Sequence, residues 1–303
     1  MFWLYLVVSA NFLYATVALL DKYILSRPDI STRAYAFYVG VFGMAAFVFV
    51  PFVGFSLIPL RPLLLSLAGG AFFIMAIRVY YKALQEKEVV RAASVTGALI
   101  PLFTFVLSMI FLGELLETNE LLAFAFLAGG SFFIAFELRG NKFVFDAPIK
   151  RTLAALLLAA FFVSMRAVYL EVSFWDGFLW ARVGGLAAAL FILFGFAASK
   201  QKIKDFFRGR DHRSVGRLFF VSKGASALAF LIFNYAILLE TPTLVNAFNG
   251  LQYGFIFLLA ILLAKFLPRV IKEESIAEKK VWLLKFGALG LIVVGFTILF
   301  RIF

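Results

Sequence analysis

The chain has 303 residues, of which 64% are hydrophobic and 15% are charged, with a mean hydropathy of +1.00 and a formal net charge of +12. A soluble domain is about half apolar, so this composition excludes an ordinary water-soluble globule. The absence of cysteine excludes disulfides and thiol nucleophiles, and a single histidine, His212, makes a histidine-based metal site or catalytic base unexpected. We therefore predict no metal, no cofactor and no enzymatic activity.

Long apolar stretches predict membrane-spanning helices. A helix needs about 20 apolar residues to cross a hydrocarbon core of about 30 Å, and only helices or closed barrels satisfy the backbone in lipid. The stretches are long and continuous, unlike the short alternating strands of a barrel, so they predict helices. The ten predicted spans are 2–20, 34–55, 62–84, 90–113, 119–137, 152–171, 176–198, 216–239, 242–266 and 281–300.

The longest mid-chain polar break, 138–151, leaves five predicted spans on each side. Weak similarities relate the two halves: Gly70 and Tyr81 align with Gly224 and Tyr235 at one offset. An odd number of spans per half requires the halves to insert in opposite orientations, as in many secondary transporters. We predict an all-α integral membrane protein with ten transmembrane helices in two inverted five-helix repeats. The predicted boundaries are 1–140 for the first repeat, 141–151 for a linker and 152–303 for the second repeat.

The distribution of basic residues predicts the orientation. Outside the predicted spans, Lys and Arg lie almost entirely in the odd-numbered loops, and the opposite face carries only Arg61 and Arg301. The positive-inside rule places the odd-numbered loops in the cytoplasm and both termini outside, in what we expect to be a prokaryotic cell membrane. The basic stretch 200–217 is expected to lie against anionic lipid headgroups and to bind no nucleic acid.

A stripe of polar side chains interrupts the ninth predicted span, "LVNAFNGLQYGF" (244–255). At helical spacing, Asn246, Asn249 and Tyr253 share one face, and Gln252 flanks it. Buried amides are costly without partners, so the stripe should face the bundle. Two interpretations of the stripe are equally well supported. The amides form hydrogen bonds between helices, or they line a cavity that offers donors and acceptors to a polar substrate.

Four cations lie well inside predicted spans, away from their ends: Arg78, Arg166, Arg182 and Lys223. Intramembrane charges are expensive and are commonly functional. One interpretation pairs each cation with an acid on a neighbouring helix, for example Arg166 with Asp21 or Glu171. The other binds an anionic or carboxylate-bearing substrate, for which Arg182 and Lys223 are the best candidates.

The acids Asp21, Glu171 and Glu114 fall at predicted span ends and are the candidates for proton coupling. The residues predicted to bind substrate are Arg182, Lys223, Asn246, Asn249, Gln252, Tyr253, Arg78, Tyr81, Asn11 and Tyr14.

Several motifs resemble the EamA-type branch of the drug/metabolite transporter superfamily. "FLYATVALLDKYIL" (12–25) resembles the family's first helix, and "LIPLFTFVLSMIFLGE" (99–114) resembles its fourth. Arg182 stands where the family often has an arginine, whereas Tyr38 replaces it in the first half. The second Gly-Glu is missing, and "LAKFLP" stands in its place. The family usually keeps both termini cytoplasmic, opposite to the orientation that the charges predict.

The resemblance implies a secondary transporter that moves a small polar metabolite by alternating access, with its cavity between helices 1–4 and 6–9 near the midplane. The expected partners are a small-molecule substrate and membrane lipids, and the peripheral helices 5 and 10 are compatible with a homodimer. The leading alternative is a flippase for a lipid-linked or phospholipid headgroup on the same fold. A membrane enzyme or a channel is less well supported, because no convergent acids, metal-binding pair or filter motif is visible.

Overall fold

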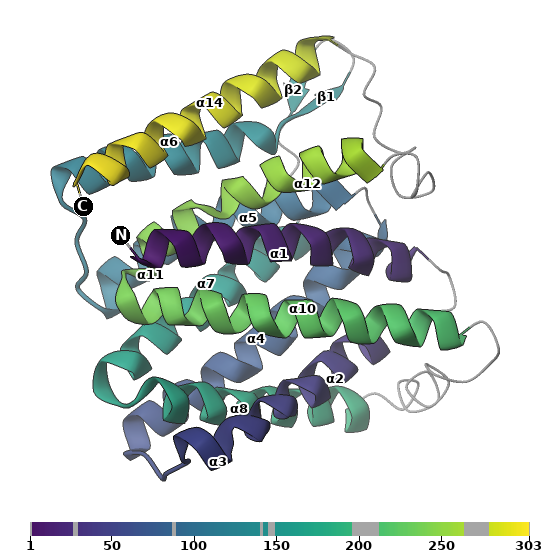
Figure 1. Cartoon of the computed structure of the whole chain (residues 1–303), viewed down its shortest axis with the longest axis vertical. Coiled ribbons are helices and arrows are strands. Elements are labelled where there is room, and N and C mark those ends of the chain that lie inside the picture. Colours follow the sequence, from purple (N-terminus) through teal and green to yellow (C-terminus); the bar gives the residue numbers. More distant parts are fainter. Residues whose placement is uncertain are drawn as a thin grey trace.

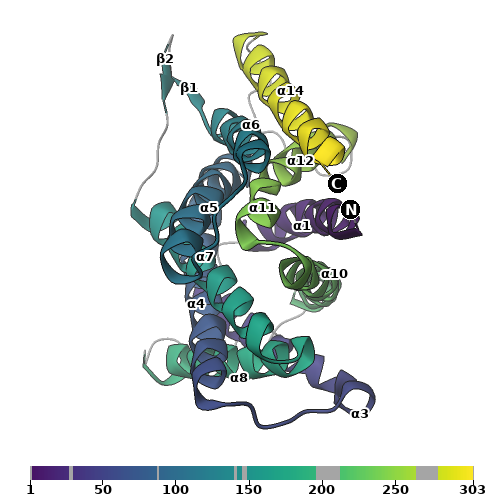
Figure 2. The ribbon, with the colours of Figure 1, turned by 90° about the vertical axis from the view of Figure 1, so that its left-hand side faces the viewer.

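The computed structural model describes residues 2–26, 30–86, 89–139, 142–144, 149–195, 212–263 and 279–302, and these residues are almost entirely helical (Figures 1 and 2). The first half contains α1 (Phe2–Leu25), α2 (Thr32–Gly43), the 3₁₀ helix η1 (Met44–Phe49), α3 (Val50–Val53), α4 (Leu60–Glu86), α5 (Val89–Phe111) and α6 (Thr118–Ile134). The second half contains α7 (Ile149–Glu171), α8 (Phe174–Phe194), α10 (His212–Leu239), α11 (Pro242–Ala247), α12 (Asn249–Leu263) and α14 (Lys279–Ile302).

A short hairpin at the boundary between the predicted first repeat and the predicted linker is the one strand pair in the described residues. There β1 (Glu137–Arg139) pairs antiparallel with β2 (Lys142–Val144), with Leu138 opposite Phe143. The basic stretch predicted to meet lipid headgroups, 200–217, lies for the most part outside the described residues.

Within the residues that the structure describes, seven helical segments are long and apolar enough to cross a membrane. They are Phe2–Leu25, Thr32–Val53, Leu60–Gln85, Ile149–Glu171, Phe174–Phe194, Gly216–Leu239 and Leu283–Phe300. Two shorter apolar helices, Val95–Phe111 and Thr118–Ile134, accompany them. The chain is therefore an integral membrane protein, as predicted. Helical segments lie over every predicted span, but the count of ten crossings and the inversion of the repeats remain predictions.

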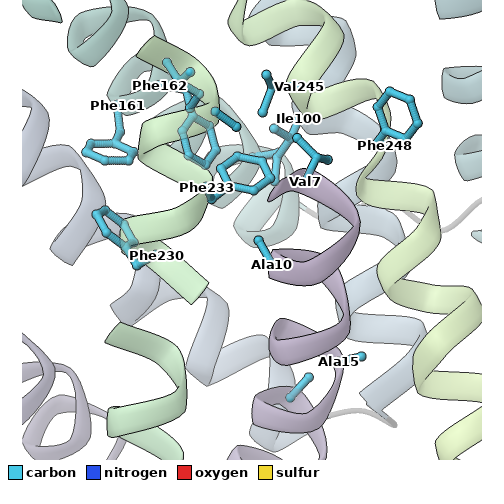
Figure 3. Close-up of a cluster of buried hydrophobic side chains, with 14 of the residues drawn as sticks. Val7, Ala10, Ala15, Ile100, Phe161, Phe162, Phe230, Phe233, Val245 and Phe248 are labelled. Atoms are coloured by element: carbon cyan, nitrogen blue, oxygen red, sulfur yellow. The ribbon is translucent and has the colours of Figure 1, made fainter. Parts of the chain in front are cut away.

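The two predicted halves interleave. α1 packs along α10, α4 packs against α7 and α8, and α6 pairs with α14 at one edge of the molecule (Figure 1). Aromatic and aliphatic side chains from both halves meet in the core between them (Figure 3). The labelled members of this cluster are Val7, Ala10, Ala15, Ile100, Phe161, Phe162, Phe230, Phe233, Val245 and Phe248.

Glycines permit the close approach of α4 and α8. A Cβ atom added at Gly70 would lie 1.8 Å from the Ala181 carbonyl oxygen, and one at Gly184 would lie 2.1 Å from the Leu67 carbonyl oxygen. Only a residue without a side chain allows such backbone contact, which is a common way to pack helices in lipid. α4 and α8 are therefore in close backbone contact at these glycines.

Candidate functional site

Two neighbouring cavities lie between the helices. The central cavity, of about 140 Å³, is bordered by α1, α4, α5, α7, α10 and α12. The lateral cavity, of about 310 Å³, is bordered by α2, η1, α4, α8 and α10. Phe73, Ser226 and Phe230 line both, so these three residues form part of the partition between the cavities.

The central cavity gathers six of the thirteen predicted site residues. Its lining includes Tyr14, Asp21, Tyr81, Asn249, Gln252 and Tyr253. Residues of the first and the second half, predicted separately from their sequence positions, thus lie around one space. The stripe on the ninth predicted span faces the interior of the bundle, as its helical spacing indicates.

The amides also mark a break in the helix. α11 ends at Ala247 and α12 begins at Asn249, with Phe248 between them in a turn. The fully buried Asn246 donates from Nδ2 to the Pro242 carbonyl oxygen at 2.8 Å, and Asn249 Nδ2 donates to Asn246 Oδ1 at 3.3 Å. These two hydrogen bonds stay within the α11–α12 segment and do not join neighbouring spans, as interhelical bonding would. Asn249, Gln252 and Tyr253 border the central cavity.

Tyr253 rests directly on α5. A Cβ atom added at Gly97 would lie only 1.3 Å from the Tyr253 hydroxyl oxygen. Gly97 thus makes room for the phenol ring at the crossing of α5 and α12, the fourth and ninth predicted spans. The phenol is 4% exposed, so its position is fixed by this crossing.

Lys223 is not the unmatched cation that the sequence predicted. Its Nζ lies 2.8 Å from Asp21 Oδ2 and donates to the Tyr81 hydroxyl at 3.0 Å. The other carboxylate oxygen, Asp21 Oδ1, accepts hydrogen bonds from the Tyr35 hydroxyl at 2.6 Å and the Ser222 hydroxyl at 2.5 Å. All five residues are buried. We name them the Asp21 cluster; it joins α1, α2, α4 and α10.

Asp21 lies within α1 and not at its end. α1 continues through Leu25, so Asp21 lies inside the helix and is 3% exposed. Its charge is compensated by Lys223 and by two hydroxyl donors, as a buried carboxylate requires. Asp21 borders the central cavity and Lys223 borders the lateral cavity, so the ion pair lies between the two spaces.

Arg182 is the predicted cation that has no acid partner in the described part of the chain. Its guanidinium carbon lies 4.2 Å from the ring centre of Phe230, 4.7 Å from that of Phe178 and 5.8 Å from that of Phe73. The Nε atom is buried and has no hydrogen-bond partner among the described residues. Cation–π contacts compensate part of this desolvation, but the hydrogen-bond donors remain available to an anion in the lateral cavity.

Arg166 is paired, but with neither of the acids that the sequence suggested. Its Nε lies 3.0 Å from Glu114 Oε1, and its Nη1 donates to the carbonyl oxygens of Ile237 and Leu238 at the end of α10. Glu171 instead pairs with Arg61 at 2.9 Å, at an exposed site. Two of the acids predicted for proton coupling thus belong to ion pairs outside the linings of both cavities.

Glu240 lies close to the Arg166 pair, in the turn between α10 and α11. Its Oε1 accepts a hydrogen bond from the Thr241 backbone N–H at 2.8 Å. Burial raises the pKa of the Glu240 carboxyl, and the nearby Glu120 and Glu114 carboxylates raise it further. The Thr241 N–H and Arg166 act in the opposite direction, without cancelling the increase.

Three of the residues predicted to bind substrate do not border either cavity. Asn11 is fully buried and donates from Nδ2 to the Val7 carbonyl oxygen at 2.9 Å. Asn246 bonds within its own helix, and Arg78 is partly exposed on α4.

The structure also adds residues that the sequence did not single out. Ser222 and the phenylalanines around Arg182 carried no signal, because serines and phenylalanines are frequent in these spans.

The comparisons with known proteins confirm the resemblance. Residues 1–136 match the model of the EamA-like transporter family. A solved structure described only as "Crystal structure of protein" superposes with a TM-score of 0.61 at 19% identity, over 97% of this chain and 94% of the other. That likeness shows the shared fold across both halves. No curated protein matches the chain.

The family match and the apolar helices together define the class: this is a membrane transporter. Its first half, residues 1–136, matches the EamA-like transporter family of the drug/metabolite transporter superfamily.

Proposed function

We propose that the protein is a secondary transporter that moves an anionic or carboxylate-bearing metabolite by alternating access. The observation that carries the proposal is Arg182, a cation at a mid-helix position beside a cavity, without an acid partner among the described residues. Keeping such a charge inside a membrane protein is costly unless it has a partner or a function. A carboxylate bound by charge-assisted hydrogen bonds would supply that partner.

The packing of the helices supports two inverted five-helix repeats. In such a scheme α1, α4 and α5 of the first half correspond to α7, α10 and α12 of the second. The contact of α1 with α10 then corresponds to that of α4 with α7, and the contact of α5 with α7 corresponds to that of α1 with α12. A pseudo-two-fold axis predicts this pairing of contacts. α6, the last helix of the first half, corresponds to α14, the last helix of the second half, and these two helices also pack together.

One pair of contacts departs from this symmetry. α4 and α8 are in backbone contact through Gly70 and Gly184. The corresponding helices α10 and α2 meet at Phe219 and Phe42, and the lateral cavity separates them farther along. Alternating access in inverted repeats exchanges the conformations of the two halves. We therefore propose that in the opposite state α2 closes on α10, and α4 separates from α8.

The orientation of the chain in the membrane is part of the proposal. The basic odd-numbered loops indicate that the ends of α1 and α4 nearest the Asp21 cluster face the cytoplasm. The Arg166 pair then lies at the opposite face.

The test is uptake into proteoliposomes that contain the purified protein. We would offer radiolabelled carboxylates, phosphorylated metabolites, neutral sugars and quaternary amines, with and without the same compound inside. We expect saturable uptake of an anion that falls about 10- to 100-fold in Arg182→Gln, since a hydrogen bond to a charged group contributes about 1.5–3 kcal/mol. Arg61→Gln, at an exposed arginine, is the control and should transport normally. Saturable uptake of only cations or neutral compounds, unchanged in Arg182→Gln, would contradict the proposal.

A further inference from the structure

We infer that the lateral cavity binds an organic monoanion with an apolar, ring-sized body, and that this acid enters from the hydrocarbon core of the membrane between α2 and α10. The inference rests on the proposed function and names its substrate class. It replaces the small polar metabolite that the family resemblance implies with an amphipathic one.

The lining of the lateral cavity selects for an apolar body. Beside Arg182 it presents Phe42, Phe49, Phe73, Phe178 and Phe230, together with small and aliphatic residues of η1 and α10. A sugar or another highly hydroxylated metabolite would leave most of its polar groups without partners against such walls, at a cost of about 1–3 kcal/mol per group. A hydrocarbon or aromatic body would instead gain from burial against the rings.

The charges around the lateral cavity select for a single negative charge. Arg182 and Lys223 are the cations in its lining. Lys223 is already neutralised by Asp21 at 2.8 Å and hydrogen-bonded to Tyr81. Arg182 alone therefore offers an uncompensated positive charge, which matches one carboxylate better than a doubly charged phosphate ester.

The volume of the lateral cavity fits a ring-bearing acid. An apolar cavity of about 150 Å³ in another protein holds benzene, and this cavity measures about 310 Å³. It thus has room for an aromatic ring and a short acidic chain. Gly43 leaves free space beside the guanidinium, because a Cβ atom there would lie 3.5 Å from Arg182 Cδ.

The position of the cavity indicates entry from lipid. Five residues that line it are exposed: Ala45, Phe49, Gly224, Ala227 and Leu228. The α10 residues among them lie in the middle part of Gly216–Leu239, the segment long enough to cross the membrane. An opening at that depth faces hydrocarbon, where an apolar acid accumulates and a polar metabolite does not. Close to this opening, aromatic contacts of Phe42 with Phe219 and Phe220 join α2 to the beginning of the α10 span.

Binding to the full-length protein in nanodiscs of zwitterionic lipid tests the substrate class. The probe is radiolabelled 4-phenylbutyrate, with empty nanodiscs subtracted. The competitors are unlabelled 4-phenylbutyrate, the matched alcohol and amine (4-phenylbutanol and 4-phenylbutylamine), and the small polar acid glycolate. We expect displacement by the acid at least tenfold more effective than by the alcohol, the amine or glycolate. Arg182→Gln should abolish the preference for acid over alcohol, and Arg182→Lys should retain part of it.

Two tryptophan substitutions test the route of entry. Ala227→Trp fills the opening and should slow 4-phenylbutyrate association at least tenfold. Leu121→Trp, at an exposed position of α6 away from both cavities, is the matched control and should leave association unchanged. Equal association rates for the two variants would overturn lateral entry. The thermal midpoint of each variant separates loss of binding from loss of folding, and the acid–alcohol comparison in the wild-type protein requires no variant.

The remaining outcomes separate this inference from the proposed function. Arg182-dependent binding of glycolate, but not of 4-phenylbutyrate, would overturn the inference and leave an anion transporter in place. Binding of neither acid in an Arg182-dependent manner would overturn both. Displacement of 4-phenylbutyrate only when anionic phospholipid is added to the nanodiscs would assign the cavity to a lipid headgroup and would also overturn the inference.

Discussion

Lys223 Nζ and Asp21 Oδ2 lie 2.8 Å apart, and both residues are less than 5% exposed. One comes from the first half of the chain and the other from the second. Tyr35, Tyr81 and Ser222 complete their hydrogen bonds. The pair lies between the central and the lateral cavity. It therefore contributes to the stability of the fold and to the barrier between the two cavities.

Removing one member of this pair should be strongly destabilising. Asp21→Asn leaves the Lys223 ammonium buried without a counter-charge, and Lys223→Met leaves the carboxylate likewise. Breaking a buried pair in this way costs about 3–5 kcal/mol. The double variant Asp21→Asn/Lys223→Met removes both charges and should recover much of that loss. The measurement is the thermal midpoint of unfolding in detergent, evaluated as a double-mutant cycle.

The exposed pair of Arg61 and Glu171 provides the control for this cycle. The two side chains are 75% and 33% exposed, and their nitrogen and oxygen atoms lie 2.9 Å apart. At such exposure an ion pair contributes about 0–1 kcal/mol, so Glu171→Gln should change stability little. A loss in Asp21→Asn no larger than in Glu171→Gln would show that the buried pair does not hold the helices together.

The sequence predicted those features of the site that depend on a single helix. Asn249 and Tyr253 share one face of α12 by their spacing, and that face does border the cavity. Arg182 was identified because a charge in an apolar span needs no structural context to stand out. In both cases the relevant information is local, so helical periodicity and hydropathy suffice.

The sequence did not predict the partners of a residue where these depend on which helices pack together. The first charge after an apolar run predicts that the span ends before Asp21, whereas α1 continues through Leu25. Its partner is 202 positions away along the chain. Likewise, 41 phenylalanines offer no means of recognising the few that surround Arg182. Pairing between distant helices requires the three-dimensional structure.

The contact between Gly97 and Tyr253 gives a second stability prediction. In Gly97→Ala the new methyl group would lie 1.3 Å from the Tyr253 hydroxyl oxygen and 2.4 Å from Cζ. The ring has to move or α5 and α12 have to separate, and overpacking of this kind costs about 1–3 kcal/mol. Thermal unfolding should show the loss. In Tyr253→Ala/Gly97→Ala the combined loss should be smaller than the sum of the single losses, since the clash is gone.

Gly129→Ala is the matched control for this substitution. A Cβ atom there meets no atom within 4 Å, and alanine favours a helix over glycine by up to about 1 kcal/mol. Unchanged or slightly increased stability is expected. Equal effects of Gly97→Ala and Gly129→Ala would indicate that α5 and α12 are not in the contact described here.

The Glu240 carboxyl predicts how stability depends on pH. Its pKa in the folded protein is raised by burial and by the Glu120 and Glu114 carboxylates. A carboxyl with a raised pKa favours the folded state fully only below the unfolded value of about 4.3. That contribution is lost as the pH rises through the folded value, because the buried group then becomes charged. The wild-type protein should therefore lose stability over this interval.

Glu240→Gln should remove this pH-dependent loss, because the amide stays neutral and its oxygen can still accept from the Thr241 N–H. Thermal midpoints of the variant and the wild-type protein should be similar at pH 4.5, and the variant should be the more stable of the two at pH 8. Glu171→Gln gives the opposite control: at pH 8 it loses an ion pair with Arg61, so its midpoint should be unchanged or lower. A Glu240→Gln midpoint below that of the wild-type protein at pH 8 would mean that the ionised carboxylate stabilises the turn through Arg166, and that the Arg166 contribution outweighs burial.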